Sequence, residues 1–301
     1  MGNNTEALWV IILRFVRLNN DRNGNALSNV QTIDIKGTLA LAATIIAFLV
    51  GITLLQNINN VGTRYQVGGI FAASGLALAT FIIIEKRVPS PLLDLKLIRS
   101  KSFLPPTIIL MLVFMSIFMV YMTVPVLVRS PRPLGFGGNA VTVASIQLPF
   151  MVVLLIGTIM SGFILNKVKN TKVMVFGTAI SAAGFFVLLI FHSTENMVSV
   201  GLTILAAGLS LSMMGAFNVI LLSVPMKMTG IALGMTLLLN FVGMSVGPAV
   251  SGVIQEIYKG MVPSLTGFFP TAHAYNLIFI IATLVSVASL TMALYVIRTK
   301  I

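Results

Sequence analysis

Eight long apolar runs that hold almost no charge constrain this chain of 301 residues more than any other feature. A bilayer core about 30 Å thick takes roughly 20 apolar residues of helix to cross. Because lipid offers the backbone no hydrogen-bond partner, a crossing segment must satisfy its own amides, as an α-helix does. The sequence therefore predicts an all-α polytopic membrane protein with transmembrane helices over residues 37–56, 66–85, 104–127, 141–165, 173–192, 198–221, 230–256 and 275–297.

The composition excludes several other classes of protein. Hydrophobic residues make up 57% of the chain and charged residues 9%, against about a quarter charged in soluble domains. Cysteine is absent, which excludes disulfides and thiolate metal sites, and two separated histidines, His192 and His273, make a poor metal site. We expect no metal, no cofactor and no enzymatic activity, because the chain has no phosphate-loop, zinc-protease or nucleophile-elbow motif.

The net charge of +12 follows the predicted topology. Of the 19 basic residues, 15 fall in segments on one face of the membrane, and the other face holds Arg64, Arg129, Arg132 and Lys259. An excess of Lys and Arg marks cytoplasmic loops. We therefore expect both termini in the cytoplasm, contact with the lipid bilayer, and no nucleic-acid binding.

Residues 1–36 are predicted to form a cytoplasmic N-terminal segment. Within it, residues 7–16 are apolar, but ten residues are too few to cross a bilayer. This run is either the remnant of a missing helix, which we favour, or a short interfacial helix. Two transmembrane helices over 37–85 follow, and a basic connector over 86–103 separates them from the remaining spans.

The connector resembles that of a known transporter family. After Glu85 it reads Lys-Arg-Val-Pro-Ser-Pro-Leu-Leu-Asp-Leu-Lys-Leu-Ile-Arg-Ser-Lys-Ser-Phe. This is similar to the cytoplasmic connector of the fourteen-span drug:proton antiporters of the major facilitator superfamily, in which an acidic–basic pair and a Pro-Leu-x-x-Leu stretch precede a long helix. The prolines stop the preceding helix, and the leucines predict a short amphipathic helix in the interface.

A cytoplasmic loop and a glycine-rich helix extend this resemblance. In the loop, Gly162 and Lys167 fit the superfamily's G-x-x-x-D-R-x-G-R-K pattern, Asn166 replaces the acid, and Lys172 closes the loop. The family uses this loop as a charged latch between helices, so the resemblance implies a weaker latch here. The helix carries the G-x8-G-x3-G-P spacing of the antiporter motif, at Gly234, Gly243, Gly247, Pro248 and Gly252.

The resemblance implies a C-terminal portion of such a transporter, with two linker helices and then one six-helix bundle over 104–301. Met1 is then an internal start, in a truncated copy, a fragment or one part of a split gene. The implied function is export of drugs or small lipophilic compounds by alternating access, coupled to protons when the transporter is complete. An N-terminal half-transporter or a homodimer partner would supply the second bundle. The alternative is a non-transporting truncated membrane protein, or a regulatory or assembly subunit of a full-length carrier.

The polar residues inside the predicted spans are neutral. None of the seven acidic residues lies in the middle of a span, and Glu85 and Glu256 lie at span ends. By resemblance, the helices that contact the central cavity carry four candidate substrate-pathway residues: Tyr121, Gln147, Asn218 and Asn240. The alternative for each is a structural interhelical hydrogen bond. Phe114 and Phe118 are either further substrate contacts or ordinary packing.

Overall fold

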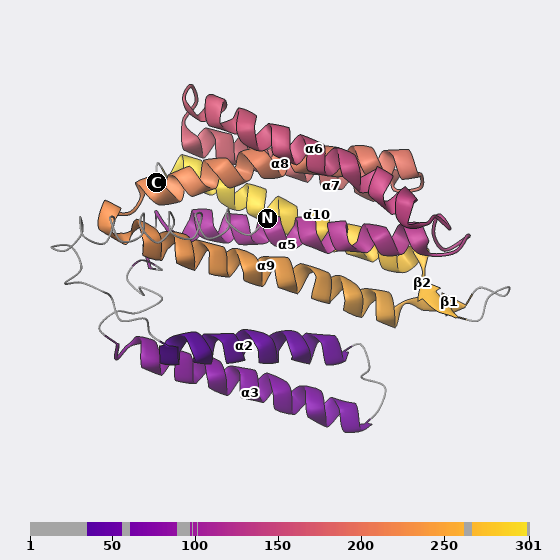
Figure 1. The fold of residues 1–301 in the computed structure, drawn as a ribbon, viewed down its shortest axis with the longest axis horizontal. Helices are drawn as coiled ribbons and strands as arrows, with labels where there is room; N and C mark the ends of the chain where they lie inside the picture. The colour runs from indigo at the N-terminus through magenta and orange to yellow at the C-terminus, as the bar shows by residue number, and fades with distance from the viewer. Residues whose placement is uncertain are drawn as a thin grey trace, which may run out of the picture.

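The computed structural model describes residues 35–55, 61–88, 97, 99–100, 102–261 and 267–299. Eight helices in this part of the chain are long and apolar enough to cross a membrane, and they run side by side along one direction (Figure 1). Their bounds are Ile35–Leu54 (α2), Val61–Glu85 (α3), Leu104–Arg129 (α5), Ala140–Leu165 (α6), Asn170–Phe191 (α7), Glu195–Leu222 (α8), Thr229–Ile257 (α9) and Ala272–Arg298 (α10).

The all-α membrane fold expected from the apolar runs is confirmed, because each predicted span coincides with one of these helices. The largest difference is at the start of α3, which begins at Val61 although the prediction placed it at residue 66. The extra turn contains Gly62 and Arg64, whose low hydropathy places this turn outside the apolar run. Helical backbone thus continues beyond the apolar stretch into the interfacial region.

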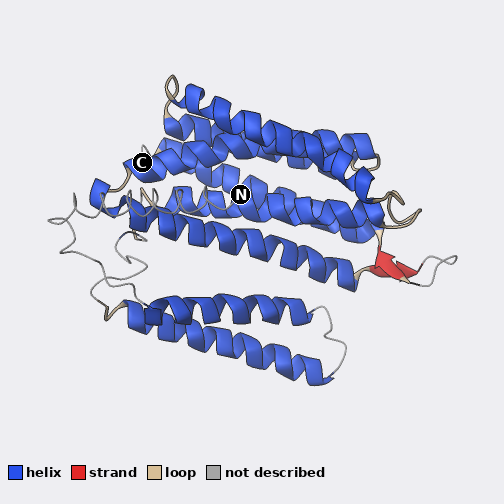
Figure 2. Ribbon diagram, viewed as in Figure 1, coloured by secondary structure: helices blue, strands red, loops and turns tan. Residues whose placement is uncertain are grey.

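Short elements mark the two ends of the bundle. Between α9 and α10, strands β1 (Lys259–Met261) and β2 (Phe268–Pro270) pair as an antiparallel hairpin (red in Figure 2). We call this side, with the turn 130–139 and the α7–α8 link, the hairpin end. The α6–α7 loop and the 3-10 helix η3 (Met226–Met228) lie at the opposite side, which we call the basic end. The four basic residues predicted to share one face all lie at the hairpin end.

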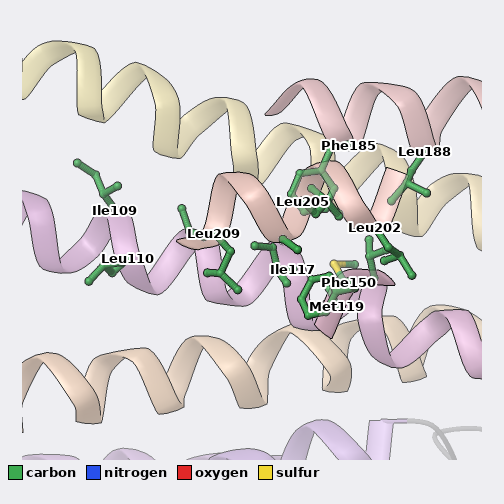
Figure 3. Packing of buried hydrophobic residues seen from close by; sticks show 14 of the residues in the cluster. Ile109, Leu110, Ile117, Met119, Phe150, Phe185, Leu188, Leu202, Leu205 and Leu209 are labelled. Atoms are coloured by element: carbon green, nitrogen blue, oxygen red, sulfur yellow. The ribbon is translucent and has the colours of Figure 1, made fainter. Parts of the chain in front are cut away.

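Helix α5 lies at the centre of the last six helices. It packs against α8, α9 and α10, while α8 also packs along α6 and α7. The buried core lies between these helices and includes Ile109, Leu110, Ile117 and Met119 of α5 together with side chains of α6, α7 and α8 (Figure 3). By contrast, α2 and α3 pack mainly on each other and meet the rest of the molecule through α9 (Figure 1). An apolar cleft of about 320 Å³ lies between this pair and α9.

The glycines of α8, which recur every seven residues, provide its close contact with α7, because small residues let two helices approach closely. A Cβ added at Gly208 would collide with the backbone of Ser181, and one at Gly215 would collide with the backbone of Met174. The side chain of Leu188 occupies the equivalent place beside Gly201. The two helices therefore meet along their length at a separation that only glycine permits at these positions.

Candidate functional site

Two of the four candidate substrate-pathway residues meet at the junction of α5 and α6. The side-chain Nε2 of Gln147 donates a hydrogen bond to the backbone carbonyl of Tyr121 at 2.9 Å. Phe150, one turn after Gln147 on α6, places its ring 4.8 Å from that of Tyr121, centroid to centroid. Residues three apart share a helix face, so Gln147 and Phe150 both approach Tyr121.

Phe114 and Phe118 extend this junction along α5. Their ring centroids are 6.2 Å apart, and Phe118 lies 6.4 Å from Tyr121. The three α5 rings are partly exposed, whereas Phe150 is only 4% exposed and anchors the group in the core. Aromatic rings at such distances attract one another through their edges and faces. We call Phe114, Phe118, Tyr121, Gln147 and Phe150 the aromatic face.

The aromatic face offers apolar area together with a few neutral polar atoms. The Tyr121 hydroxyl and the Gln147 Oε1 have no hydrogen-bond partner among the described residues. Both can bond a ligand that stacks on the rings. No acidic residue occupies the middle of a described helix, since Glu85, Glu195 and Glu256 all lie at helix ends. The face therefore suits neutral or weakly polar lipophilic molecules.

The other two polar candidates lie elsewhere. Asn218 lies four residues before the end of α8 at the basic end, whereas Gln147 is seven residues into α6 from the hairpin end. At 1.5 Å per residue these two levels differ by about 25 Å. The Asn218 Nδ2 donates to the Met214 carbonyl of its own helix at 2.9 Å. The four residues do not form one site.

Asn240 on α9 differs from the other three. Its side chain is 3% exposed, and neither its Nδ2 nor its Oδ1 has a partner among the described residues. A buried amide without hydrogen bonds costs about 1–3 kcal/mol. Asn240 remains a candidate for contact with a transported molecule or ion at a second level of the bundle.

The antiporter-like glycines of α9 have different surroundings. An added Cβ would collide with the Met111 carbonyl oxygen at Gly243 and with the Met115 carbonyl oxygen at Gly247. Gly234 has no described atom within 4 Å of that position. Pro248 lies inside the helix and Gly252 is half-buried. Gly243 and Gly247 therefore bring α9 against α5, whereas Gly234 does not.

The residues of the loop motif lie around the link between α6 and α7. Gly162 has open space beside it, Asn166 caps the end of α6, and Lys167 and Lys172 are exposed. Neither lysine makes an ion pair with a described residue. The arrangement agrees with a loop that lacks the acid of the family pattern.

The comparisons with known proteins fit this architecture. Residues 35–248 match the model of the Major Facilitator Superfamily, and the chain belongs to this family of membrane transporters. It is therefore an integral membrane protein of the transporter class.

Individual relatives are drug-resistance proteins. The chain is 27% identical over 194 residues to the tetracenomycin C resistance and export protein of Streptomyces glaucescens, covering 64% of this chain and 35% of that protein. It is 22% identical over 245 residues to the quinolone resistance protein NorB of Staphylococcus aureus strain MRSA252, covering 79% of this chain and 51% of that protein. The chain thus spans about half, or less, of the length of these curated relatives.

Sequence reasoning missed two contacts of α5. Phe150 completes the aromatic face, and its position three residues after Gln147 was the available signal. The Gln255 Nε2 donates to the Thr123 Oγ1 at 3.3 Å and joins α9 to α5. No pattern predicts that bond, because it depends on the register in which two separate helices pack.

Proposed function

We propose that this chain forms part of an exporter of drugs or lipophilic compounds, and that its substrates bind at the aromatic face. The observation that carries the proposal is the junction at which Gln147 holds the Tyr121 backbone while the rings of Tyr121 and Phe150 pack together. A partly exposed set of rings with a few unpaired polar atoms binds flat apolar molecules and orients them. The names of the relatives support the drug class of substrate.

Alternating access is the proposed mechanism. In such transporters, the substrate site lies between two bundles that rock about it. We assign α5–α10 to one bundle and α2–α3 to linker helices of the fourteen-span antiporter branch. The second bundle comes from a half-transporter partner or from a second copy of this chain. Both termini then lie in the cytoplasm.

Proton coupling belongs to the complete transporter. Intramembrane carboxylates are the usual carriers of protons through such proteins. The acids of the described helices lie at their ends, and Glu256 forms an ion pair with Lys259. We therefore place the coupling carboxylate on the second bundle.

Efflux of Nile red, a neutral lipophilic dye, tests the proposal. The chain is produced in a host that lacks its major efflux pumps, either alone or together with the first-half helices of a fourteen-span relative. Efflux of the dye from the cells is followed before and after an uncoupler is added. Uncoupler-sensitive efflux that Gln147→Leu weakens would support the proposal. Membrane insertion without efflux in either arm, across a panel of lipophilic dyes, would favour a non-transporting subunit instead.

A further inference from the structure

A second cleft lies at the hairpin end, away from the aromatic face. It has a volume of about 460 Å³ and is formed where the ends of α5 and α7 meet the start of α10. Leu127, Leu134 and Phe136 supply apolar walls, Arg132 supplies nitrogen donors, and His192 supplies an imidazole nitrogen. The described residues that line it include no acidic side chain. A cationic cleft with apolar walls selects a ligand that has both an anionic and an apolar part.

The turn 130–139 fixes the position of Arg132. Phe136 N–H donates to the Leu127 carbonyl at 3.2 Å, and Gly137 N–H donates to the Ser130 carbonyl at 2.8 Å. Gly137 has a φ of 68°, a conformation that favours glycine. The Arg132 Nε donates to the Phe136 carbonyl at 3.2 Å. The guanidinium is thereby held in place with its two Nη groups available to a ligand.

His192 is held in a similar way at the end of α7. Its Nδ1 lies 2.9 Å from the Leu188 carbonyl oxygen, which can only accept, so Nδ1 carries a hydrogen and donates it. The imidazole packs against the Phe279 ring at 4.8 Å between centroids. This leaves Nε2 as the ring nitrogen without a partner among the described residues. In the neutral ring Nε2 accepts a hydrogen bond from a ligand hydroxyl, and in the protonated ring it donates one to an anion.

The first turn of α10 adds to the positive character of the cleft. Ala272 and Tyr275 line it. Thr271, at the N-cap, makes no side-chain cap bond, because its hydroxyl donates to the Tyr258 carbonyl at 3.0 Å. An uncapped helix start presents unpaired N–H groups and a partial positive charge. The helix end and the two side chains reinforce one another.

We propose that this cleft binds the head of an anionic amphiphile. The phosphate or carboxylate group contacts Arg132 and the first turn of α10. His192 Nε2 donates to this group when the ring is protonated, and accepts from a hydroxyl of the ligand head when the ring is neutral. The apolar part lies against Leu127, Leu134 and Phe136. The anion comes from a membrane phospholipid or from a free amphiphile, which share this chemistry. This site is separate from the proposed transport surface, so either assignment stands without the other.

Native mass spectrometry of the full chain in neutral detergent tests the site. The probes are dioleoyl phosphatidylglycerol and octyl phosphate, with inorganic phosphate as the probe that lacks a tail. We expect Arg132→Gln to weaken binding of an amphiphile about tenfold, the equivalent of about 1.4 kcal/mol. His192→Gln should weaken it to a smaller extent, and Arg132→Lys should retain part of the affinity because it keeps the charge.

Arg129→Gln is the matched control, because Arg129 is an exposed residue at the same end that does not line the cleft. It removes the same charge and should leave binding unchanged. If Arg132→Gln weakens the binding of phosphatidylglycerol alone, the result supports a membrane lipid as the ligand. If it also weakens the binding of octyl phosphate, the result supports a ligand that can also enter from water. Equal effects of Arg129→Gln and Arg132→Gln would overturn the site. Inorganic phosphate that binds as tightly as octyl phosphate would overturn the role of the apolar walls.

Discussion

Substitution of Gly247 by alanine tests whether α9 lies against α5 as the structure places it. The new Cβ would collide with the Met115 carbonyl oxygen and would also lie 3.1 Å from the Met115 carbonyl carbon and the Met119 nitrogen. To restore van der Waals distances, α9 must move away from α5 by about 1 Å. A gap of that size forfeits a quarter to a half of the dispersion energy of each contact. Overpacking of this kind costs about 1–3 kcal/mol.

Gly234→Ala on the same helix is the matched control, because no described atom lies within 4 Å of its added Cβ. Alanine gains about 1 kcal/mol over glycine in a helix interior. Because both variants have this gain, the difference between them isolates the steric cost. We expect Gly247→Ala to be about 1–3 kcal/mol less stable than Gly234→Ala. The assay is unfolding of the detergent-solubilised protein followed by far-UV circular dichroism. Equal stabilities of the two variants would refute the α5–α9 contact.

Two further predictions concern an aromatic and a polar residue, and a third concerns the topology. Phe118→Ala should weaken dye transport several-fold, because an aromatic contact contributes about 0.5–1.5 kcal/mol. Phe163→Ala, on the exposed face of α6, is the control and should leave dye transport unchanged. Equal losses of transport in the two variants would show that the aromatic face is not part of the substrate pathway. Asn240→Leu should raise the unfolding free energy by about 1–3 kcal/mol, because it replaces an amide without partners; lower stability would indicate a hidden partner. A C-terminal reporter that is active only in the periplasm should remain silent, and a signal would reverse the proposed topology.

Most of the fold was predictable from the sequence because lipid allows few solutions. A long apolar run must become a helix, so the eight spans and their ends followed from hydropathy alone, with the polar first turn of α3 as the main error. The spacing of Gly201, Gly208 and Gly215 indicates a close helix contact. The spacing does not identify the partner helix, because it depends on the sequence of α8 alone.

The candidate site was less predictable than the fold. Polarity inside a span selected Tyr121, Gln147, Asn218 and Asn240, but only the first two lie together. Whether polar residues on different helices meet depends on their depth and on helix rotation, and the sequence of one span specifies neither. The cleft of Arg132 and His192 depends on residues 60 positions apart in sequence. No local motif could have indicated it.

The α7–α8 contact determines which parts of the bundle can slide. The glycines of α8, seven residues apart, lie beside Leu188, Ser181 and Met174, which are also seven apart on α7. The two helices therefore pack closely only in this register, and a shift of seven residues, about 10 Å along the helix axis, is needed to reach the next equivalent register. Small sliding motions between α7 and α8 are therefore blocked. The bundle must change shape at seams with sparse contacts, such as that between α5 and α6, where Gln147 and Tyr121 form the crossing hydrogen bond.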